Sequence, residues 1–471
     1  MITWIVFAVY ALAMIYLGYR SRHTEKGDDY WTAARGLSGW SAGLSLSAGF
    51  MSISWSCVYA IQVFYWYGLS GFFLMTIPWM LALGGIYFLA VKYHNIPAFS
   101  QAEMVRQRFG ASSAVIVSIT QVVVFLIWGG AEVYVAANLL EPALGVDKKW
   151  IMLLITLTIA IYSTWGGFSA VVQTDKFQFV FVSLYLVTVF WMAWIVAPSM
   201  NLNKLIPAKT DHVLFDAKLL PLMIITAIAY LPGWLSEADL WLRVQAARDV
   251  KEARKAALIG LFNSFMFVGV IPAFIALAAM TLFPARDALT SSLIGSEGEK
   301  IIAAIVLPFD NLWMQAFLGI GLLCASMSTI DTCTNIVSLN ISRDLLQIKK
   351  LFTSKVINAL VVGVTFIVAI NVDSLWNIFY LSSGLLSTAV ALPVLSTLHK
   401  GIPSRAVFFS SFFGFISTVF FYFNGVFGWI PLTLGHAVKG TGLEYIVFGM
   451  IGAATGFVAG YFFRPARLLY R

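Results

Sequence analysis

Long apolar segments, separated by short polar or charged loops, make up most of the chain. A helix needs about 20 mostly apolar residues to cross the hydrocarbon core of a bilayer, and thirteen segments of this sequence come close to or exceed that length. The pattern therefore predicts an all-α, polytopic integral membrane protein with about 13 transmembrane helices. The predicted segments are 2–19, 38–66, 69–91, 112–140, 149–165, 168–197, 217–240, 257–284, 312–340, 354–372, 374–397, 405–424 and 442–462.

Composition and charge support a membrane location and predict an orientation. Of the 471 residues 60% are hydrophobic and only 11% are charged, whereas soluble domains carry about 25% charged residues. Basic residues gather in alternate loops, such as 243–255 and 343–350, while a loop of the opposite set, 198–216, holds only two lysines and no arginine. The positive-inside rule then places the N-terminus outside and the C-terminus in the cytoplasm of a plasma (inner) membrane. Membrane orientation explains the net charge of +8, so we expect no nucleic-acid partner.

Two of the apolar segments are interrupted. The second contains LSLSAGFMSISWS (44–56), and the seventh contains AYLPGWLSEADLW (229–241), where Pro232 removes a backbone donor. Lipid tolerates irregular backbone only where protein or a water-filled cavity surrounds it. Because five segments separate the two starts, the spacing predicts two inverted five-helix repeats. The alternative is that Pro232 is a lone kink and that the serines bond to the preceding turn.

This organisation divides the chain into three parts. We predict an extra N-terminal helix and loop, an inverted-repeat transport core whose repeats are 38–197 and 217–397, and two C-terminal helices with a short tail. The three parts are 1–37, 38–397 and 398–471.

The ninth segment carries hydroxyl groups along one helical face. In GLLCASMSTIDTCTNIVSLN (321–340), Ala325, Ser328, Thr329 and Thr332 are spaced at i, i+3, i+4 and i+7. A sodium ion prefers several oxygen ligands, which hydroxyls and freed carbonyls supply. The alternative is that these hydroxyls bond back to their own helix.

Three motifs resemble those of the sodium/solute symporter family, which includes sodium/proline, sodium/galactose and sodium/glucose carriers. They are TWGGFSAVVQTDKFQFV (164–180), LRVQAARDVKEARKAA (242–257) and ASMSTIDT (325–332). The likeness extends from Gly36 to about Pro393. It implies a LeuT-like core and sodium-coupled import of a small organic solute by alternating access. It further implies Na⁺ as the coupling ion. We also expect no enzymatic activity, because no catalytic motif is present, no organic cofactor and a functional monomer.

The resemblance also implies ion-binding residues. The sodium site implied by matching positions consists of Ala48, Met51, Ala325, Ser328 and Thr329. Some members bind a second sodium, and the matching positions here include Asp175, Asp331 and Thr332. Because Asp331 stands where some members have serine, a second sodium, a bound proton and an ion pair with a base such as Arg343 all remain open at this position.

The family's architecture brings several core helices together near the bilayer midplane. The substrate-binding candidates on them are Ser52, Trp55, Gln62, Glu132, Tyr230, Trp234, Glu237, Tyr380 and Ser383. Glu132 is notable because a carboxylate within the membrane is costly without a partner or a function, and it would suit a cationic or polyhydroxyl substrate. Phe50 and Trp55 replace polar residues of the sugar carriers, so a sugar is not indicated. The alternative functions are a proton-coupled symporter of the same fold and a transporter-like sensor or membrane receptor domain.

Overall fold

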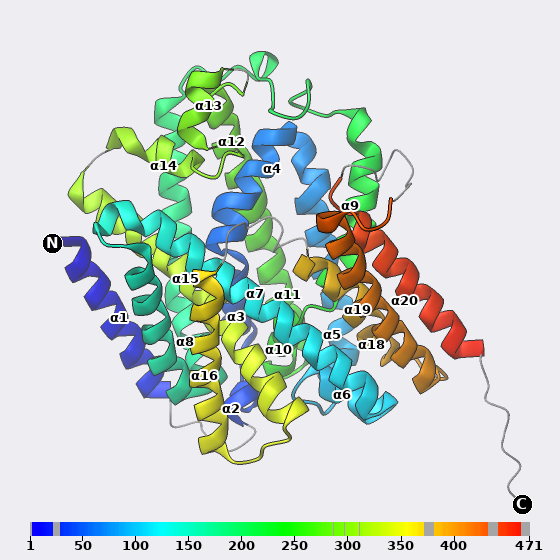
Figure 1. The fold of residues 1–471 in the computed structure, drawn as a ribbon. Helices are drawn as coiled ribbons and strands as arrows, with labels where there is room; N and C mark the ends of the chain where they lie inside the picture. The colour runs from blue at the N-terminus through cyan, green and yellow to red at the C-terminus, as the bar shows by residue number, and fades with distance from the viewer. Residues whose placement is uncertain are drawn as a thin grey trace, which may run out of the picture.

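The computed structural model describes residues 2–21, 29–285, 287–295, 297–309, 311–371, 381–431 and 441–462, and within these residues the fold is helical (Figure 1). The described part contains no β-strand, and its one extended pairing is an isolated bridge between Leu37 and Ala247. The helices are α1 (Ile2–Ser21), α2 (Asp29–Thr32), α3 (Gly39–Phe50), α4 (Ala60–Tyr67), α5 (Ile77–His94), α6 (Gln101–Phe109), α7 (Ala111–Leu144), α8 (Lys148–Val196), α9 (Leu220–Leu235), α10 (Ala238–Ala246), α11 (Val250–Ser264), α12 (Ile271–Leu282), α13 (Ala288–Ile294), α14 (Ile301–Val306), α15 (Leu312–Leu339), α16 (Leu351–Ile370), α18 (Ala391–Ser396), α19 (Ser404–Phe427) and α20 (Glu444–Phe462).

The all-helical fold class is confirmed, but the number of membrane spans is not. In the described residues ten helices are long and apolar enough to cross a membrane, or eleven if a bent pair counts as one span. The 49-residue helix α8 covers two predicted segments, 149–165 and 168–197. The predicted segment 374–397 corresponds to a shorter apolar helix at Leu381–Ser396, because residues 372–380 lie outside the described part. The count of thirteen stays a prediction.

Burial distinguishes peripheral helices from central ones. Only 22% of the apolar window of α1 is buried, whereas 78% of the corresponding window of α15 is buried. On α1, Val9 and Leu12 are more than 60% exposed while Met14 is fully buried against the rest of the protein. The exposed apolar side chains suit contact with lipid. In contrast, α15 packs against both α7 and α8 in the interior, and it carries its polar residues there.

A glycine allows α8 to change direction in its middle. Gly167 has φ 53° and ψ −146°, outside the helical region, within the predicted TWGGFS motif. A Cβ atom at this position would lie 2.4 Å from the carbonyl oxygen of Tyr30. The backbone conformation and the close approach of the chain therefore both require glycine.

We expect Gly167→Ala to lower the thermal stability of the purified protein. The backbone conformation alone costs an alanine about 1–3 kcal/mol, and the contact with Tyr30 adds to this cost. Gly363→Ala in α16 is the matched control, because no described neighbour lies within 4 Å of its Cβ position. Melting temperatures in detergent should show a clear decrease for Gly167→Ala and little change for Gly363→Ala. Equal melting temperatures would contradict the argument.

Two helices are interrupted in the middle of the fold. The helical axis bends by 57° between α3 and the segment Ile53–Ser70, and the break includes extended Ser52 with ψ 159°. Between α9 and α10 the extended residue is Glu237, with ψ 130°. The predicted interruption of the second apolar segment lies where the structure has it. In the seventh segment, by contrast, α9 continues past Pro232 and ends at Leu235. The second interruption thus comes about one turn after the proline that suggested it.

Candidate functional site

Hydroxyl groups of α15 face the break at the end of α3. Ser328 Oγ donates to the carbonyl oxygen of Ala48 at 3.1 Å, and Thr329 Oγ1 donates to that of Gly49 at 3.1 Å. The same hydroxyls lie 3.2 and 3.4 Å from the carbonyl oxygen of Ala325. Four of the five predicted sodium-site residues therefore meet here.

The fifth predicted residue, Met51, directly follows the last residue of α3 and is its C-cap. Its amide still donates to Ser47, but the next residue, Ser52, is extended, so the helix cannot supply hydrogen-bond donors to the last carbonyls of α3 in the regular way. Carbonyl oxygens at such an end, together with rotatable hydroxyls, form a group of neutral oxygen ligands that suits a hard cation.

Next to these oxygens lies a buried ionic cluster centred on Arg243. Arg243 is 1% exposed and its Nη2 atom lies 3.2 Å from Asp175 Oδ2 and 3.1 Å from Thr332 Oγ1. Its Nη1 atom lies 3.4 Å from Asp239 Oδ2, and Ser45 donates to Asp175 at 2.5 Å. Two of the three predicted second-sodium residues, Asp175 and Thr332, thus share a guanidinium group.

Asp331, the third predicted second-sodium residue, has different partners. Tyr162 Oη donates to its Oδ2 atom at 2.7 Å, and Thr174 Oγ1 lies 3.4 Å from the same oxygen. Within the described residues Asp331 forms no ion pair within 4.0 Å, and its Oδ1 atom has no hydrogen-bond partner. The ion pair with Arg343 that the sequence left open is not present, because Arg343 lies over the ring of Phe99 instead.

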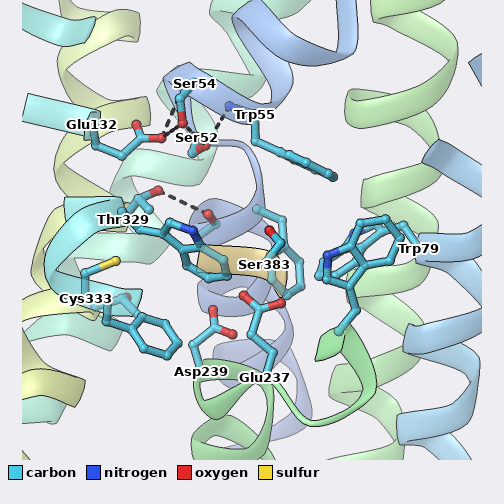
Figure 2. Close-up of a pocket in the computed structure, with 16 residues that line it drawn as sticks. Ser52, Ser54, Trp55, Trp79, Glu132, Glu237, Asp239, Thr329, Cys333 and Ser383 are labelled. Atoms are coloured by element: carbon cyan, nitrogen blue, oxygen red, sulfur yellow. Dashed lines mark hydrogen bonds between the residues drawn. The ribbon is translucent and has the colours of Figure 1, made fainter. Parts of the chain in front are cut away.

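A cavity of about 70 Å³ adjoins both clusters and is lined by residues from the two broken helices, α5, α7 and α15, and by Ser383 (Figure 2). Thr329 and Thr332 line the cavity and also belong to the oxygen cluster and the ionic cluster, respectively. An ion bound at the oxygen cluster would therefore lie next to the cavity, with Thr329 shared between the two.

Glu132 holds the start of the helical segment that follows the first break. Its two carboxylate oxygens lie 3.2 Å from the backbone nitrogens of Ile53 and Ser54, and the hydroxyl of Ser54 also donates to it (Figure 2). A carboxylate in this position satisfies backbone donors at a helix N-terminus and interacts favourably with the helix dipole. Glu132 thus has partners from the protein itself.

Six of the nine predicted substrate residues line the cavity, namely Ser52, Trp55, Glu132, Trp234, Glu237 and Ser383. Gln62 does not, because it lies farther along α4 and its amide donates to the carbonyl oxygen of Glu297 at 3.1 Å. Tyr230 stacks on Trp234 with ring centroids 5.4 Å apart and does not line the cavity. Tyr380 lies outside the described residues.

Sequence reasoning missed Trp79, Phe125 and Asp239, which also line the cavity. The two aromatic residues are two of many in apolar segments, so no local signal separates them from packing residues. Asp239 follows Glu237 by two residues, and this pairing of acids beside an interrupted helix was a usable signal.

Known proteins show what the whole chain is similar to. The profile of the sodium:solute symporter family matches residues 30–421. The sodium/glucose cotransporter of Vibrio parahaemolyticus is 28% identical over 356 residues, which cover 67% of this chain and 62% of that protein. The osmoregulated proline transporter OpuE of Bacillus subtilis is 26% identical over 282 residues, which cover 56% of this chain and 55% of that protein. The matches thus span less than two thirds of these two relatives.

A solved structure of a Na⁺-coupled sialic acid symporter, in a substrate-bound outward-open state, resembles the whole chain. It superimposes with a TM-score of 0.79 at 18% identity and covers 100% of this chain and 99% of the other. The similarity shows a shared fold. Together with the profile match over most of the sequence, it establishes that the chain belongs to the sodium:solute symporter family, a family of membrane transporters.

Proposed function

We propose that the protein is a sodium-coupled symporter that imports a small organic solute by alternating access. The observation that supports this most directly is the meeting of Ser328 and Thr329 with the carbonyl oxygens of Ala48 and Gly49 at the first helix break. Sodium would bind to these oxygens, to the carbonyl of Ala325 and to that of Met51. The ion would replace the hydrogen bonds that now join α15 to α3.

The coupling follows from the position of this site. Sodium at the oxygen cluster would hold the end of α3 against α15, and both helices contribute residues to the cavity. A solute that fits the cavity best when the two helices are held together would bind more tightly with sodium present. By linkage, it would in turn increase the affinity for sodium.

We extend the proposal to the arrangement of the chain in the membrane. Residues 38–397 would form the transport core, with the two repeats at 38–197 and 217–397, and one chain would suffice for transport. The N-terminus would lie outside and the C-terminus in the cytoplasm of the plasma (inner) membrane, since the basic residues of 248–255 and 343–350 then face the cytoplasm.

The geometry of Asp175 favours one sodium ion per cycle over two. A guanidinium group already sits 3.2 Å from Asp175 and 3.1 Å from Thr332, two of the positions where a second sodium would bind. A proton-coupled symporter is the second candidate, and the buried carboxylate of Asp331 beside Tyr162 is the observation that favours it.

Sodium binding can be tested without knowing the solute. We expect NaCl to raise the melting temperature of the purified protein above its value in equal KCl, because a ligand that binds only the folded state stabilises it. The dependence on sodium concentration should fit a single site. A melting temperature that ignores sodium and responds only to pH would exclude this mechanism and support proton coupling.

A further inference from the structure

The cavity is acidic and lacks basic side chains. Among the described residues that line it are Glu132, Glu237 and Asp239, and these lining residues include no lysine, arginine or histidine. An anionic solute would meet three carboxylates there without a matching positive charge. The cavity therefore disfavours anions and favours solutes with a positive charge.

The three carboxylates differ in how many hydrogen-bond or ion-pair partners the protein provides for them. Glu132 is occupied by the amides of Ile53 and Ser54, as described above. Glu237 stands at the start of α10, but its side chain does not cap that helix. Figure 2 shows the Glu237 and Asp239 carboxylates side by side, both directed into the cavity. Glu237 forms no ion pair in the described structure, and only the Oδ2 atom of the Asp239 carboxylate contacts Arg243, so Glu237 and the Oδ1 atom of Asp239 are the acidic groups open to a solute.

The nearby positive charge does not balance these acids. Arg243 is divided between Asp175, at 3.2 Å, and Asp239, at 3.4 Å. In the described part of the structure, Asp239 Oδ1 has no hydrogen-bond partner, although Asp239 is only 5% exposed. One guanidinium therefore pairs with two buried carboxylates, Asp175 and Asp239, and Glu237 forms no ion pair within 4.0 Å in the described structure. Negative charge buried in excess of its counter-charge is costly unless a cation or a proton accompanies it.

Aromatic rings line the cavity beside these acids. Trp55, Trp79 and Trp234 meet one another in edge-to-face contacts, with ring centroids 5.3–6.2 Å apart. Trp128 and Phe125 of α7 add a second aromatic pair at 5.1 Å. The faces of such rings attract cations, and aromatic cages are a recurrent way to bind alkylated ammonium groups.

We propose that the solute carries an alkylammonium group, which binds in the cavity against these tryptophans with its positive charge near Glu237 and Asp239. This inference rests on the proposed symport function and names its substrate class. Glucose is the competing class in the test below, because its hydroxyls could donate to the same carboxylates and accept from the indole Nε1 of Trp79, which has no hydrogen-bond partner in the described structure. The hydroxyls of Ser52, Ser54 and Thr329 already have partners in the protein.

The test measures binding of radiolabelled choline, a simple quaternary ammonium probe, to the purified full-length protein in NaCl. We expect saturable binding that tetramethylammonium inhibits and that glucose and L-proline do not. Glu237→Gln should weaken choline binding roughly 30-fold or more, as expected when one partner of a buried charge pair is removed. Glu141→Gln, which removes a carboxylate at the far end of α7, is the matched control and should bind like the wild type.

A second pair of variants separates charge recognition from simple packing. Trp234→Phe should keep much of the choline affinity because it keeps an aromatic face, and Trp234→Leu should lose most of it. Size-exclusion profiles and melting temperatures establish that each variant is folded.

Three outcomes would overturn the substrate class: no saturable choline binding, competition by glucose or proline instead, or equal affinity in Glu237→Gln and the wild type. The sodium-dependent shift in melting temperature described above tests sodium-coupled symport independently of the alkylammonium substrate class. If that shift is present and choline does not bind, symport stands and the alkylammonium class is wrong. If choline binds equally in NaCl and KCl and the shift is absent, the substrate class stands and sodium coupling is wrong.

Discussion

Removal of the two α15 hydroxyls, in the double variant Ser328→Ala with Thr329→Val, is expected to abolish the stabilisation of the protein by sodium. Each hydroxyl would contribute one oxygen to the ion, and a polar contact with a charged group is worth about 1.5–3 kcal/mol. Loss of both should lower the sodium affinity by roughly 100-fold or more. The measurement is the rise in melting temperature between KCl and NaCl over a series of concentrations.

The same helix offers a matched control for this experiment. Ser326 is also buried on α15, but its hydroxyl donates to Leu323 of its own helix at 3.1 Å, and none of its hydrogen bonds in the described structure reaches α3. Ser326→Ala should therefore respond to sodium like the wild type. If the double variant still responds normally, sodium does not bind at the break of α3, and the proposed mechanism fails.

The sequence predicts the parts of this site that depend on residues close together in the chain, and it does not predict contacts between distant segments. The spacing of Ser328 and Thr329 on one helical face is a local property, and the structure brings these residues to the broken helix as predicted. Their acceptors on the first core helix came from the family motif. The exact partner of Thr329 is Gly49, which the motif did not supply.

The contacts of Asp331 show where sequence reasoning stopped. Its partner Tyr162 is 169 residues away on α8, and only the packing of α15 against α8 brings the two together. No periodicity within either segment indicates that contact. The sequence showed that a carboxylate within the membrane needs a partner, but it could not choose among sodium, a proton and a base.

Arg243 shows that a basic residue counted toward the positive-inside rule can be buried in the protein. In the sequence it opens a run of basic residues, so the positive-inside pattern grouped it with a cytoplasmic loop. In the structure it lies on α10, which extends to Ala246, and it is among the largest fully buried side chains. The orientation prediction rests on the remaining basic residues of that run and is little affected.

The consequence is that Arg243→Met should strongly destabilise the protein. The substitution keeps the length of the side chain but leaves Asp175 and Asp239 without their buried counter-charge. Removing one partner of a buried ion pair costs about 3–5 kcal/mol. Melting temperatures and denaturant unfolding in detergent would measure this loss.

Two further variants separate the loss of charge balance from the loss of packing. Arg248→Met removes an exposed arginine that pairs with Glu252 at 3.1 Å, and such a surface pair is worth only about 0–1 kcal/mol. Adding Asp175→Asn to Arg243→Met should recover part of the stability, because it removes one of the two carboxylates left unpaired. The non-additivity of the double variant measures the coupling between the two residues. If Arg243→Met is no more harmful than Arg248→Met, the guanidinium does not balance these acids, and a second sodium ion becomes the better assignment for the cation at Asp175.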